Sequence, residues 1–256
     1  MRVSAVSYLN TWPLVWGFEH GPQKGLFDFR FDLPAICAGA VGSGEADIGL
    51  VPCAELDRLG LGFLPQLGIA CDGPVRSILL IAKCPFEEIQ TLAADSGSRT
   101  SVALARILLD KKYRCRPVIT RQSPQLEEML GACDAALIIG DPALRLEPED
   151  LPYRTLDLGA EWTAWSGLPM VFAVWAGKRE VLTPAVGGAF WDSYQWGLAH
   201  MDEIVVRAKA ERGFAEPVSR EYLTRYIQYE LSAKHLQGLE LYREYVRGLE
   251  PLAGED

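Results

Sequence analysis

Apolar runs typical of strands alternate with segments of helical periodicity through most of the chain. Phe27–Leu33 alternates strictly between apolar and polar positions, which is typical of a strand with one solvated face. Val75–Ala82, Ala135–Ile139 and Met170–Ala176 are mostly or wholly apolar, as strands buried on both faces are. Because helical segments separate these runs, the pattern predicts an α/β fold with largely parallel strand pairing.

Two passages in this pattern are similar to each other. Gly44-x-x-Asp47 opens one buried strand, and Gly131-x-x-Asp134 opens another. Each passage follows a short helical segment. The repetition indicates two lobes of similar plan rather than one long sheet.

The two strongest strands divide the chain. Val75–Ala82 and Met170–Ala176 flank the middle segment, as expected where a chain crosses from one lobe to another and returns. We therefore predict a discontinuous first lobe, residues 1–83 and 173–256, and a second lobe of residues 84–172. A cleft between two such lobes is a common site for a small molecule.

The last third of the chain has a helical pattern. Apolar residues recur at helical spacing over Thr183–Arg212, Ser219 is a candidate cap for a helix through Leu231, and a further helix is expected to run through Arg247. The tyrosines of these helices are interpreted as core or lobe packing, and we assign them no chemistry.

An irregular aromatic segment precedes the last strong strand. Leu156–Pro169 contains glycines and two tryptophans, and its pattern fits neither a strand nor a helix. Trp162 and Trp165 could line an aromatic ligand pocket. Core packing is the commoner role of a tryptophan, and it is the interpretation that we favour.

The segment Asp95–Ser101 combines four hydroxyl side chains, a glycine and an arginine. A helix is expected to begin near Thr100, and a helix start leaves several backbone N–H groups without partners at the positive end of its dipole. Ser98 and Ser101 can cap those groups or help them hold an anion, and Arg99 suits a carboxylate or phosphate. An ordinary capped helix is the alternative, but the density of polar groups favours an anion cradle.

A second candidate loop follows the first strand. Val3–Ser7 is expected to form a short strand, and a helix is expected to begin near Pro13, whose ring suits a first helical position. Open α/β sheets bind ligands in such strand-end loops. Asn10 offers both a donor and an acceptor there, although an Asx turn or a helix cap is an equally common role for this residue.

Composition excludes several classes of protein. The chain has 256 residues and a formal net charge of −9, which argues against nucleic acid or an anionic membrane as a partner. It has no apolar run of membrane-spanning length, and its first residues lack the pattern of a signal peptide. The six cysteines are scattered without a C-x-x-C motif, and the three histidines lack ligand spacing. We therefore expect a cytoplasmic protein with reduced cysteines and no metal.

Four motifs together resemble the chorismate dehydratases of the futalosine route to menaquinone. They are Ser7–Leu14, Asp95–Leu104, Ile139–Ala143 and Asp157–Ala176, so the likeness extends from the N-terminus to about Ala176. Ser166 departs from the family pattern, in which threonine is expected before Gly-Leu-Pro, but the hydroxyl group is kept.

The resemblance implies a two-lobed fold like that of type II periplasmic binding proteins, with a cleft between the lobes and a helical C-terminal segment. It implies a lyase that dehydrates chorismate, a small dicarboxylate, to 3-[(1-carboxyvinyl)oxy]benzoate without a cofactor. Two alternatives remain: a non-catalytic cytoplasmic protein that binds a small aromatic carboxylate, and the sister 1,4-dihydroxy-6-naphthoate synthase. No oligomeric partner follows from the sequence.

The resemblance also implies the key residue, Asn10. An amide cannot act as a base at neutral pH, but it can orient the leaving hydroxyl group or the substrate's own carboxylate, which can itself take the proton. Asp141 is the alternative protein base. The candidate substrate-binding residues are Thr11, Ser77, Ser96, Ser98, Arg99, Thr100, Gly140 and Asp141.

Overall fold

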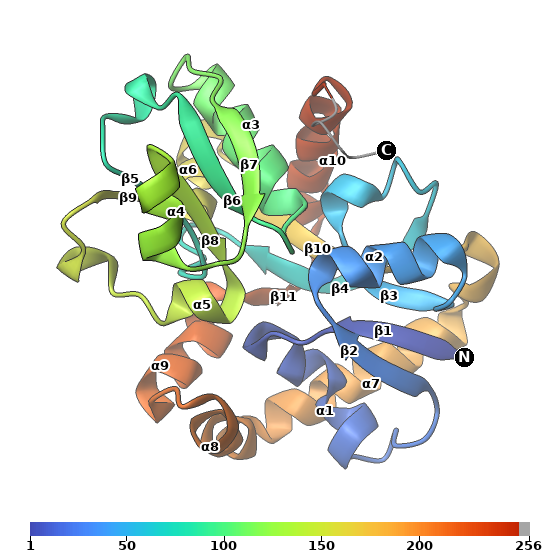
Figure 1. The fold of residues 1–256 in the computed structure, drawn as a ribbon. Coiled ribbons are helices and arrows are strands. Elements are labelled where there is room, and N and C mark those ends of the chain that lie inside the picture. Colours follow the sequence, from blue (N-terminus) through green and yellow to red (C-terminus); the bar gives the residue numbers. More distant parts are fainter. Residues whose placement is uncertain (251–256) are drawn as a thin grey trace.

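The computed structural model describes residues 1–250, which form two β-sheets with helices packed around them (Figure 1). The strands are β1 (Arg2–Val6), β2 (Asp28–Asp32), β3 (Ile48–Pro52), β4 (Gly62–Cys71), β5 (Ile78–Ala82), β6 (Thr91–Asp95), β7 (Val118–Gln122), β8 (Ala135–Ile139), β9 (Arg154–Asp157), β10 (Met170–Gly177) and β11 (Gln228–Glu230). The α-helices are α1 (Trp12–His20), α2 (Pro34–Ser43), α3 (Thr100–Lys111), α4 (Leu126–Ala132), α5 (Gly140–Leu144), α6 (Leu158–Ser166), α7 (Pro184–Ala199), α8 (Met201–Arg212), α9 (Glu216–Glu221) and α10 (Ala233–Arg247).

Both sheets are built on the same plan. The six-stranded sheet has the order β11-β4-β10-β3-β1-β2, and the five-stranded sheet has the order β7-β6-β8-β5-β9. In each sheet, three strands run parallel, and the strand beside them is antiparallel. The predicted two-part α/β plan is thus confirmed. The expectation of largely parallel pairing was wrong, because β4, β5, β9, β10 and β11 all pair antiparallel.

The two similar passages of the sequence occupy equivalent places in the two sheets. Asp47, ahead of β3, accepts hydrogen bonds from the backbone and the guanidinium of Arg2 at the start of β1. Asp134, ahead of β8, accepts hydrogen bonds from the backbone and the hydroxyl of Thr91 at the start of β6. In both sheets an aspartate therefore links the beginnings of two parallel neighbours, which explains why the Gly-x-x-Asp pattern recurs.

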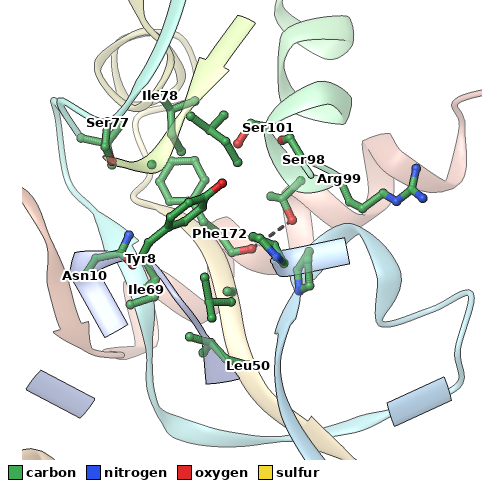
Figure 2. Close-up of a pocket in the computed structure, with 18 residues that line it drawn as sticks. Tyr8, Asn10, Leu50, Ile69, Ser77, Ile78, Ser98, Arg99, Ser101 and Phe172 are labelled. Atoms are coloured by element: carbon green, nitrogen blue, oxygen red, sulfur yellow. Dashed lines mark hydrogen bonds between the residues drawn. The ribbon is translucent and has the colours of Figure 1, made fainter. Parts of the chain in front are cut away.

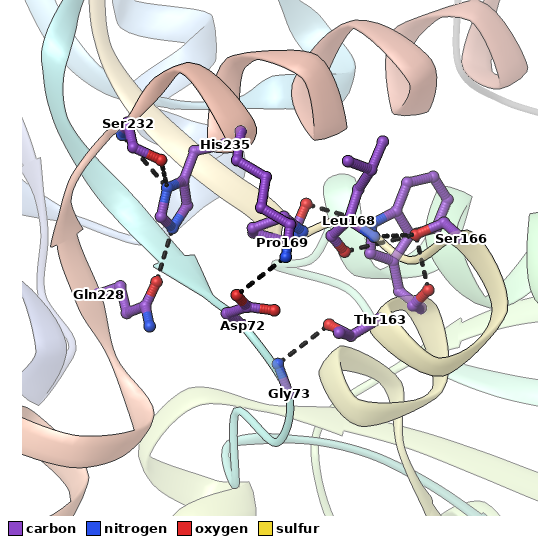
Figure 3. Close-up of polar contacts among 11 residues, drawn as sticks. Asp72, Gly73, Thr163, Ser166, Leu168, Pro169, Gln228, Ser232 and His235 are labelled. Carbon is purple, nitrogen blue, oxygen red and sulfur yellow. Dashed lines mark hydrogen bonds and ion pairs between the residues drawn. The ribbon is translucent and has the colours of Figure 1, made fainter.

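The chain crosses between the sheets twice, and the crossings lie side by side (Figure 3). The first crossing joins β4 to β5, and there Gly73 donates its N–H to the Thr163 hydroxyl of α6, just before the second crossing (3.0 Å). Lys234 of α10 pairs with Asp72 next to it (3.3 Å). The first crossing falls before Ile78, so the predicted boundary at residue 83 was misplaced: β5 belongs to the five-stranded sheet, because it pairs with β8 and β9.

A helix, α6, replaces the irregular segment that was expected after residue 156. Asp157 caps this helix by accepting hydrogen bonds from the N–H groups of Gly159 and Ala160. At the other end, the Ser166 hydroxyl donates to the Trp162 carbonyl (2.8 Å) and accepts from the Leu168 N–H (3.1 Å), as Figure 3 shows. The hydroxyl retained at position 166 therefore closes a helix. Trp162 is fully buried, and its role in core packing is confirmed.

The helical tail differs from its prediction in two places. Thr183–Arg212 forms two helices, α7 and α8, because the chain leaves helical geometry at His200. Ser219 lies inside α9 rather than capping a helix, and Gln228–Glu230 forms a strand. That strand pairs with the edge of β4, so tertiary pairing overrides the helical pattern of the sequence there.

Helices cover both sheets. In the view of Figure 1, α2 lies above the larger sheet and α1 with α7 below it, while α10 packs against α3 and β10. Fully buried side chains such as Trp175 and Phe190 form the core between α7 and the sheet. Within the described residues, no helix combines the length and the apolar character that crossing a bilayer requires.

Candidate functional site

A pocket opens between the two sheets and has about 550 Å³ of empty space, counted to its open mouth (Figure 2). Both sheets contribute walls, and most of the lining side chains are apolar. The lining residues are Val6, Tyr8, Asn10, Pro34, Leu50, Pro52, Ile69, Val75, Ser77, Ile78, Ser98, Arg99, Thr100, Ser101, Ile139, Gly140, Phe172 and Ala173. A pocket of this size with a few convergent polar groups is typical of small-molecule sites.

The start of α3 forms one polar wall of the pocket. The first helical residues, Thr100 and Ser101, present N–H groups that no carbonyl of their own helix can accept, at the positive end of its dipole. Ser98 is 1% exposed, and its hydroxyl oxygen has no hydrogen-bond partner within residues 1–250. A buried hydroxyl beside a helix start is suited to an anionic group, which agrees with the predicted cradle.

The other side chains of the cradle have different roles. The Thr100 hydroxyl donates to the carbonyl of Phe172 (3.0 Å) and accepts from the N–H of Ala54 (3.3 Å), so it fastens α3 to the larger sheet. The Arg99 side chain extends away from the pocket in Figure 2, and its Nε lies 4.0 Å from the Glu55 carboxylate. The polar groups that face the pocket are therefore the backbone of α3 and Ser98, rather than the Arg99 fork.

Asn10 belongs to a short polar network at the opposite wall. It lies in a 3-10 turn, η1 (Leu9–Thr11), and its Nδ2 donates to the Tyr222 hydroxyl oxygen (3.1 Å). Tyr222 in turn donates to Ser77 Oγ (2.8 Å). Asn10 thus makes a tertiary contact, and no side-chain cap is formed at this turn. Asn10 follows β1 and Ser77 precedes β5, so the two side chains come from the loops of different sheets, and the Tyr222 hydroxyl group bonds to both.

Tyr8 extends its ring into the pocket in Figure 2, between Ser77 and the start of α3. Gly140 lies beneath this ring with φ at +64°, and a Cβ atom there would lie 2.6 Å from the ring. Burial raises the pKa of Tyr8, and the Asp95 and Asp141 carboxylates raise it further. The phenol therefore stays protonated, so it can donate a hydrogen bond to a ligand but cannot act as a base near neutral pH.

Asp141 holds the Asn10 loop from outside the pocket. Its Oδ1 accepts from the Leu9 N–H (2.9 Å), and its Oδ2 pairs with Arg212 (2.9 Å), which also donates to the Ser7 carbonyl (2.6 Å). Burial raises the pKa of the Asp141 carboxyl, while the Leu9 amide and Arg212 oppose the shift. Asp141 does not line the pocket, and both its oxygens already accept hydrogen bonds, so the prediction that it contacts the substrate does not agree with this geometry.

Two other predicted residues also lie outside the pocket lining. Thr11, the last residue of the η1 turn, is fully buried, and its hydroxyl has no hydrogen-bond partner among the described residues. Ser96 is exposed at the surface of the second lobe. The remaining predicted residues, Asn10, Ser77, Ser98, Arg99, Thr100 and Gly140, come together around one pocket.

Sequence reasoning missed two tyrosines of this site. Tyr8 lies directly within the Ser7–Thr11 motif, so its place could have been inferred from Asn10. Tyr222 lies in the helical tail, to which the sequence analysis assigned no chemistry. It belongs to none of the four motifs, so no local pattern indicated its role. Asn10 carried a signal that the motif alone does not show, since it is the only asparagine of the chain.

Residues 1–248 match the protein family described as menaquinone biosynthesis. A chorismate dehydratase of Thermus thermophilus is 32% identical, and the alignment covers 93% of this chain and 92% of the relative. The chain belongs to this menaquinone-biosynthesis family. A chorismate dehydratase of Campylobacter jejuni is 28% identical over 65% of this chain and 58% of its own length.

Solved structures of similar fold establish the architecture of this family member. A protein of Archaeoglobus fulgidus superposes with a TM-score of 0.78 at 16% identity, with 96% of both chains covered. The periplasmic aliphatic sulphonate-binding protein of Escherichia coli superposes with a TM-score of 0.64 at 15% identity, covering 98% of this chain and 89% of that one. The predicted two-lobed, periplasmic-binding-protein-like fold is thus confirmed.

Proposed function

We propose that this chain is a chorismate dehydratase that forms 3-[(1-carboxyvinyl)oxy]benzoate and water without a cofactor. One observation carries the proposal: the motifs that resemble this family converge on one pocket, with Asn10 on one wall and the α3 start on the other. The relationship to the Thermus thermophilus chorismate dehydratase supports the same reaction.

The pocket suits a dianionic ring. Chorismate carries a ring carboxylate and an enolpyruvyl carboxylate on a cyclohexadiene. We assign one carboxylate to the Ser98 hydroxyl and the Thr100 and Ser101 N–H groups, where the helix dipole adds a favourable field. The apolar walls, which include Leu50, Ile69 and Phe172, then enclose the ring. This attraction is local, which reconciles an anionic ligand with a chain of net charge −9.

The reaction requires orientation more than strong acid–base chemistry. The C3–H bond and the C4–O bond break, the C3–H electron pair forms the new ring double bond, and the hydroxyl group leaves with the C4–O pair. The proton and the hydroxyl group together make water. Because the product ring is aromatic, elimination is strongly downhill, and holding the reacting groups in place supplies much of the acceleration.

The substrate's own carboxylate is the proton acceptor in this proposal. Asp141 is the alternative protein base named from the sequence, but its carboxylate is bonded to the Leu9 N–H and to Arg212, and it lies outside the pocket lining. Tyr8 remains protonated, and no histidine lines the pocket. Asn10 would orient the leaving hydroxyl group or the accepting carboxylate through hydrogen bonds, without changing its own protonation state.

Conversion of chorismate, followed by ultraviolet absorbance, tests the proposal. Wild-type protein should produce the benzoate spectrum over many turnovers, and Asn10→Ala should abolish turnover while its circular dichroism and melting temperature stay near the wild-type values. Gln228→Ala is the control, because it removes a half-buried amide whose partner, His235, lies away from the pocket. It should turn over normally.

Two results would overturn the assignment. A wild-type protein that binds chorismate stoichiometrically without converting it would be a binding protein. A protein that leaves chorismate untouched but consumes cyclic dehypoxanthine futalosine would be the sister naphthoate synthase. Full activity in Asn10→Ala would leave the assigned reaction in place but would show that Asn10 is not a catalytic residue.

A further inference from the structure

The C-terminal segment places the hydroxyl group of Tyr222 between Asn10 and Ser77, two polar side chains that line the pocket opposite the start of α3. Tyr222 begins a π-helical turn, η6 (Tyr222–Tyr226), directly after α9. Single π-helical turns are often found at functional sites. The Tyr222 side chain is 1% exposed, and its hydroxyl group lies within hydrogen-bond distance of both Asn10 and Ser77.

A phenol has one proton, so Tyr222 can donate to only one of these two neighbours. It donates to Ser77 Oγ at 2.8 Å and accepts from Asn10 Nδ2 at 3.1 Å. The orientation of the amide is thereby linked to that of the serine hydroxyl group. With one Nδ2–H directed at Tyr222, the orientation of the amide is set, and its Oδ1 atom is available to accept a hydrogen bond from a ligand. With its oxygen accepting from Tyr222, Ser77 keeps its own proton for a ligand.

We propose that Tyr222 is a positioning residue, which makes Asn10 an acceptor and Ser77 a donor toward the substrate. The inference rests on the proposed function for its chemistry. An acceptor suits the proton of the substrate's C4 hydroxyl group, and a donor suits the oxygen of that group as it leaves, or a carboxylate oxygen. Tyr222 itself does not line the pocket, so it acts through its two neighbours.

Burial keeps this network in one state. Burial raises the pKa of Tyr222, so the phenol remains a donor throughout the neutral range. Tyr229 offers a contrast in the same segment: it is also buried, but its hydroxyl group has no hydrogen-bond partner within residues 1–250. Removing the hydroxyl group from Tyr229 should therefore leave the pocket unchanged, whereas its removal from Tyr222 should release both neighbours.

Kinetics provide the first test. Tyr222→Phe keeps the ring and should lower kcat about 10- to 100-fold, because small misplacements of reacting groups have effects of that size. KM should stay within about threefold, since the cradle at the α3 start is intact. Tyr229→Phe is the matched control and should retain both constants. A kcat within twofold of wild type in Tyr222→Phe would overturn the proposal, as would an equal loss in Tyr229→Phe.

The second test reads the Asn10 amide directly. Because Asn10 is the only asparagine, protein labelled with ¹⁵N at asparagine side chains should give a single pair of side-chain N–H signals in an NMR spectrum. Tyr222→Phe should shift that pair and speed its exchange with water, and Tyr229→Phe should not. Unchanged Asn10 signals in a folded Tyr222→Phe protein would overturn the proposal.

The two tests also separate this inference from the proposed function. A wild-type protein that fails to convert chorismate would refute the function, while the NMR comparison would still decide whether Tyr222 orients Asn10. If Tyr222→Phe does not fold, Ser77→Ala is the second variant. This variant removes the Ser77 oxygen that accepts the Tyr222 proton. The Tyr222 hydroxyl group should then donate to Asn10 Oδ1, and the side-chain amide signals of Asn10 should shift. Undisturbed signals in folded Ser77→Ala would contradict the network.

Discussion

Replacing Gly140 by alanine should disturb the pocket through a single methyl group. Gly140 has φ at +64°, a left-handed conformation that alanine adopts only with strain. A Cβ atom at this position would also lie 2.6–2.7 Å from three ring atoms of Tyr8, which is far inside van der Waals contact. To relieve this clash, either the Tyr8 ring or the backbone around Gly140 must move.

The expected cost is the sum of two terms. The left-handed backbone contributes about 1–2 kcal/mol to the loss in free energy of unfolding. Forcing a methyl group into a packed site contributes about 1–3 kcal/mol more. Gly140→Ala should therefore destabilise the protein by roughly 2–5 kcal/mol, and kcat should fall at least tenfold, because Tyr8 extends into the pocket.

Urea unfolding and steady-state kinetics on matched variants separate these terms. Gly167→Ala is the control for the backbone term, since Gly167 has φ at +74° and no atom within 4 Å of the added Cβ. It should lose only about 1–2 kcal/mol and keep its turnover. The double variant Tyr8→Ala/Gly140→Ala should lose less free energy of unfolding than the sum of the losses in the two single variants, because the added methyl group no longer meets the Tyr8 ring.

Either of two results would refute this reasoning. If Gly140→Ala is no less stable than Gly167→Ala and keeps its kcat, then the Tyr8 ring is not held over Gly140. The double variant provides a second check, because additive losses would mean that the methyl group and the ring do not meet.

Two further predictions concern Ser98 and Asp134. Ser98→Ala should change the free energy of unfolding by less than about 0.5 kcal/mol, because the Ser98 hydroxyl group has no hydrogen-bond partner among the described residues. Its KM for chorismate should rise several-fold, and an unchanged KM would show that Ser98 is not part of the anion cradle. Hydrogen bonds from Thr91 and Gln90 hold the pKa of Asp134 below its usual value, so its carboxylate should stabilise the fold by about 1 kcal/mol above pH 4 and lose that effect as pH falls through the lowered pKa. Asp134→Asn should accordingly be less stable than wild type at pH 7 in urea unfolding, and the difference should shrink as the pH falls below about 4. A difference independent of pH would contradict this assignment.

Local sequence signals predicted the parts of the site that local chemistry determines. The helix start at Thr100 follows from its hydroxyl-rich turn and the apolar spacing after it, and α3 begins at that residue. The Asn10 loop follows from a buried strand that ends just before it. These features depend on residues close together in the sequence, so periodicity and capping preferences are sufficient to find them.

Contacts between distant segments could not be predicted in this way. Tyr222 meets Asn10 from 212 residues away, and the packing of the C-terminal tail on the six-stranded sheet brings them together. Arg99 lies in the pocket lining as predicted, but its side chain extends outward, where its Nε lies 4.0 Å from the Glu55 carboxylate of the other lobe. Asp141 follows a strand end like a site residue, yet Arg212 and the Leu9 amide satisfy it. In each case a tertiary partner decides the role.

The same contacts explain how a fold shared with sulphonate-binding proteins could support an elimination. A binding protein needs only to enclose its ligand, and a helix start with apolar walls can do that. An elimination also needs the leaving group and the proton acceptor held in fixed relation. Here the loop that carries Asn10 is tied on one side by Asp141 and Arg212 and on the other by Tyr222. Because Arg212 and Tyr222 both belong to the C-terminal segment, that segment, rather than the lobes alone, fixes the geometry on which the proposed chemistry depends.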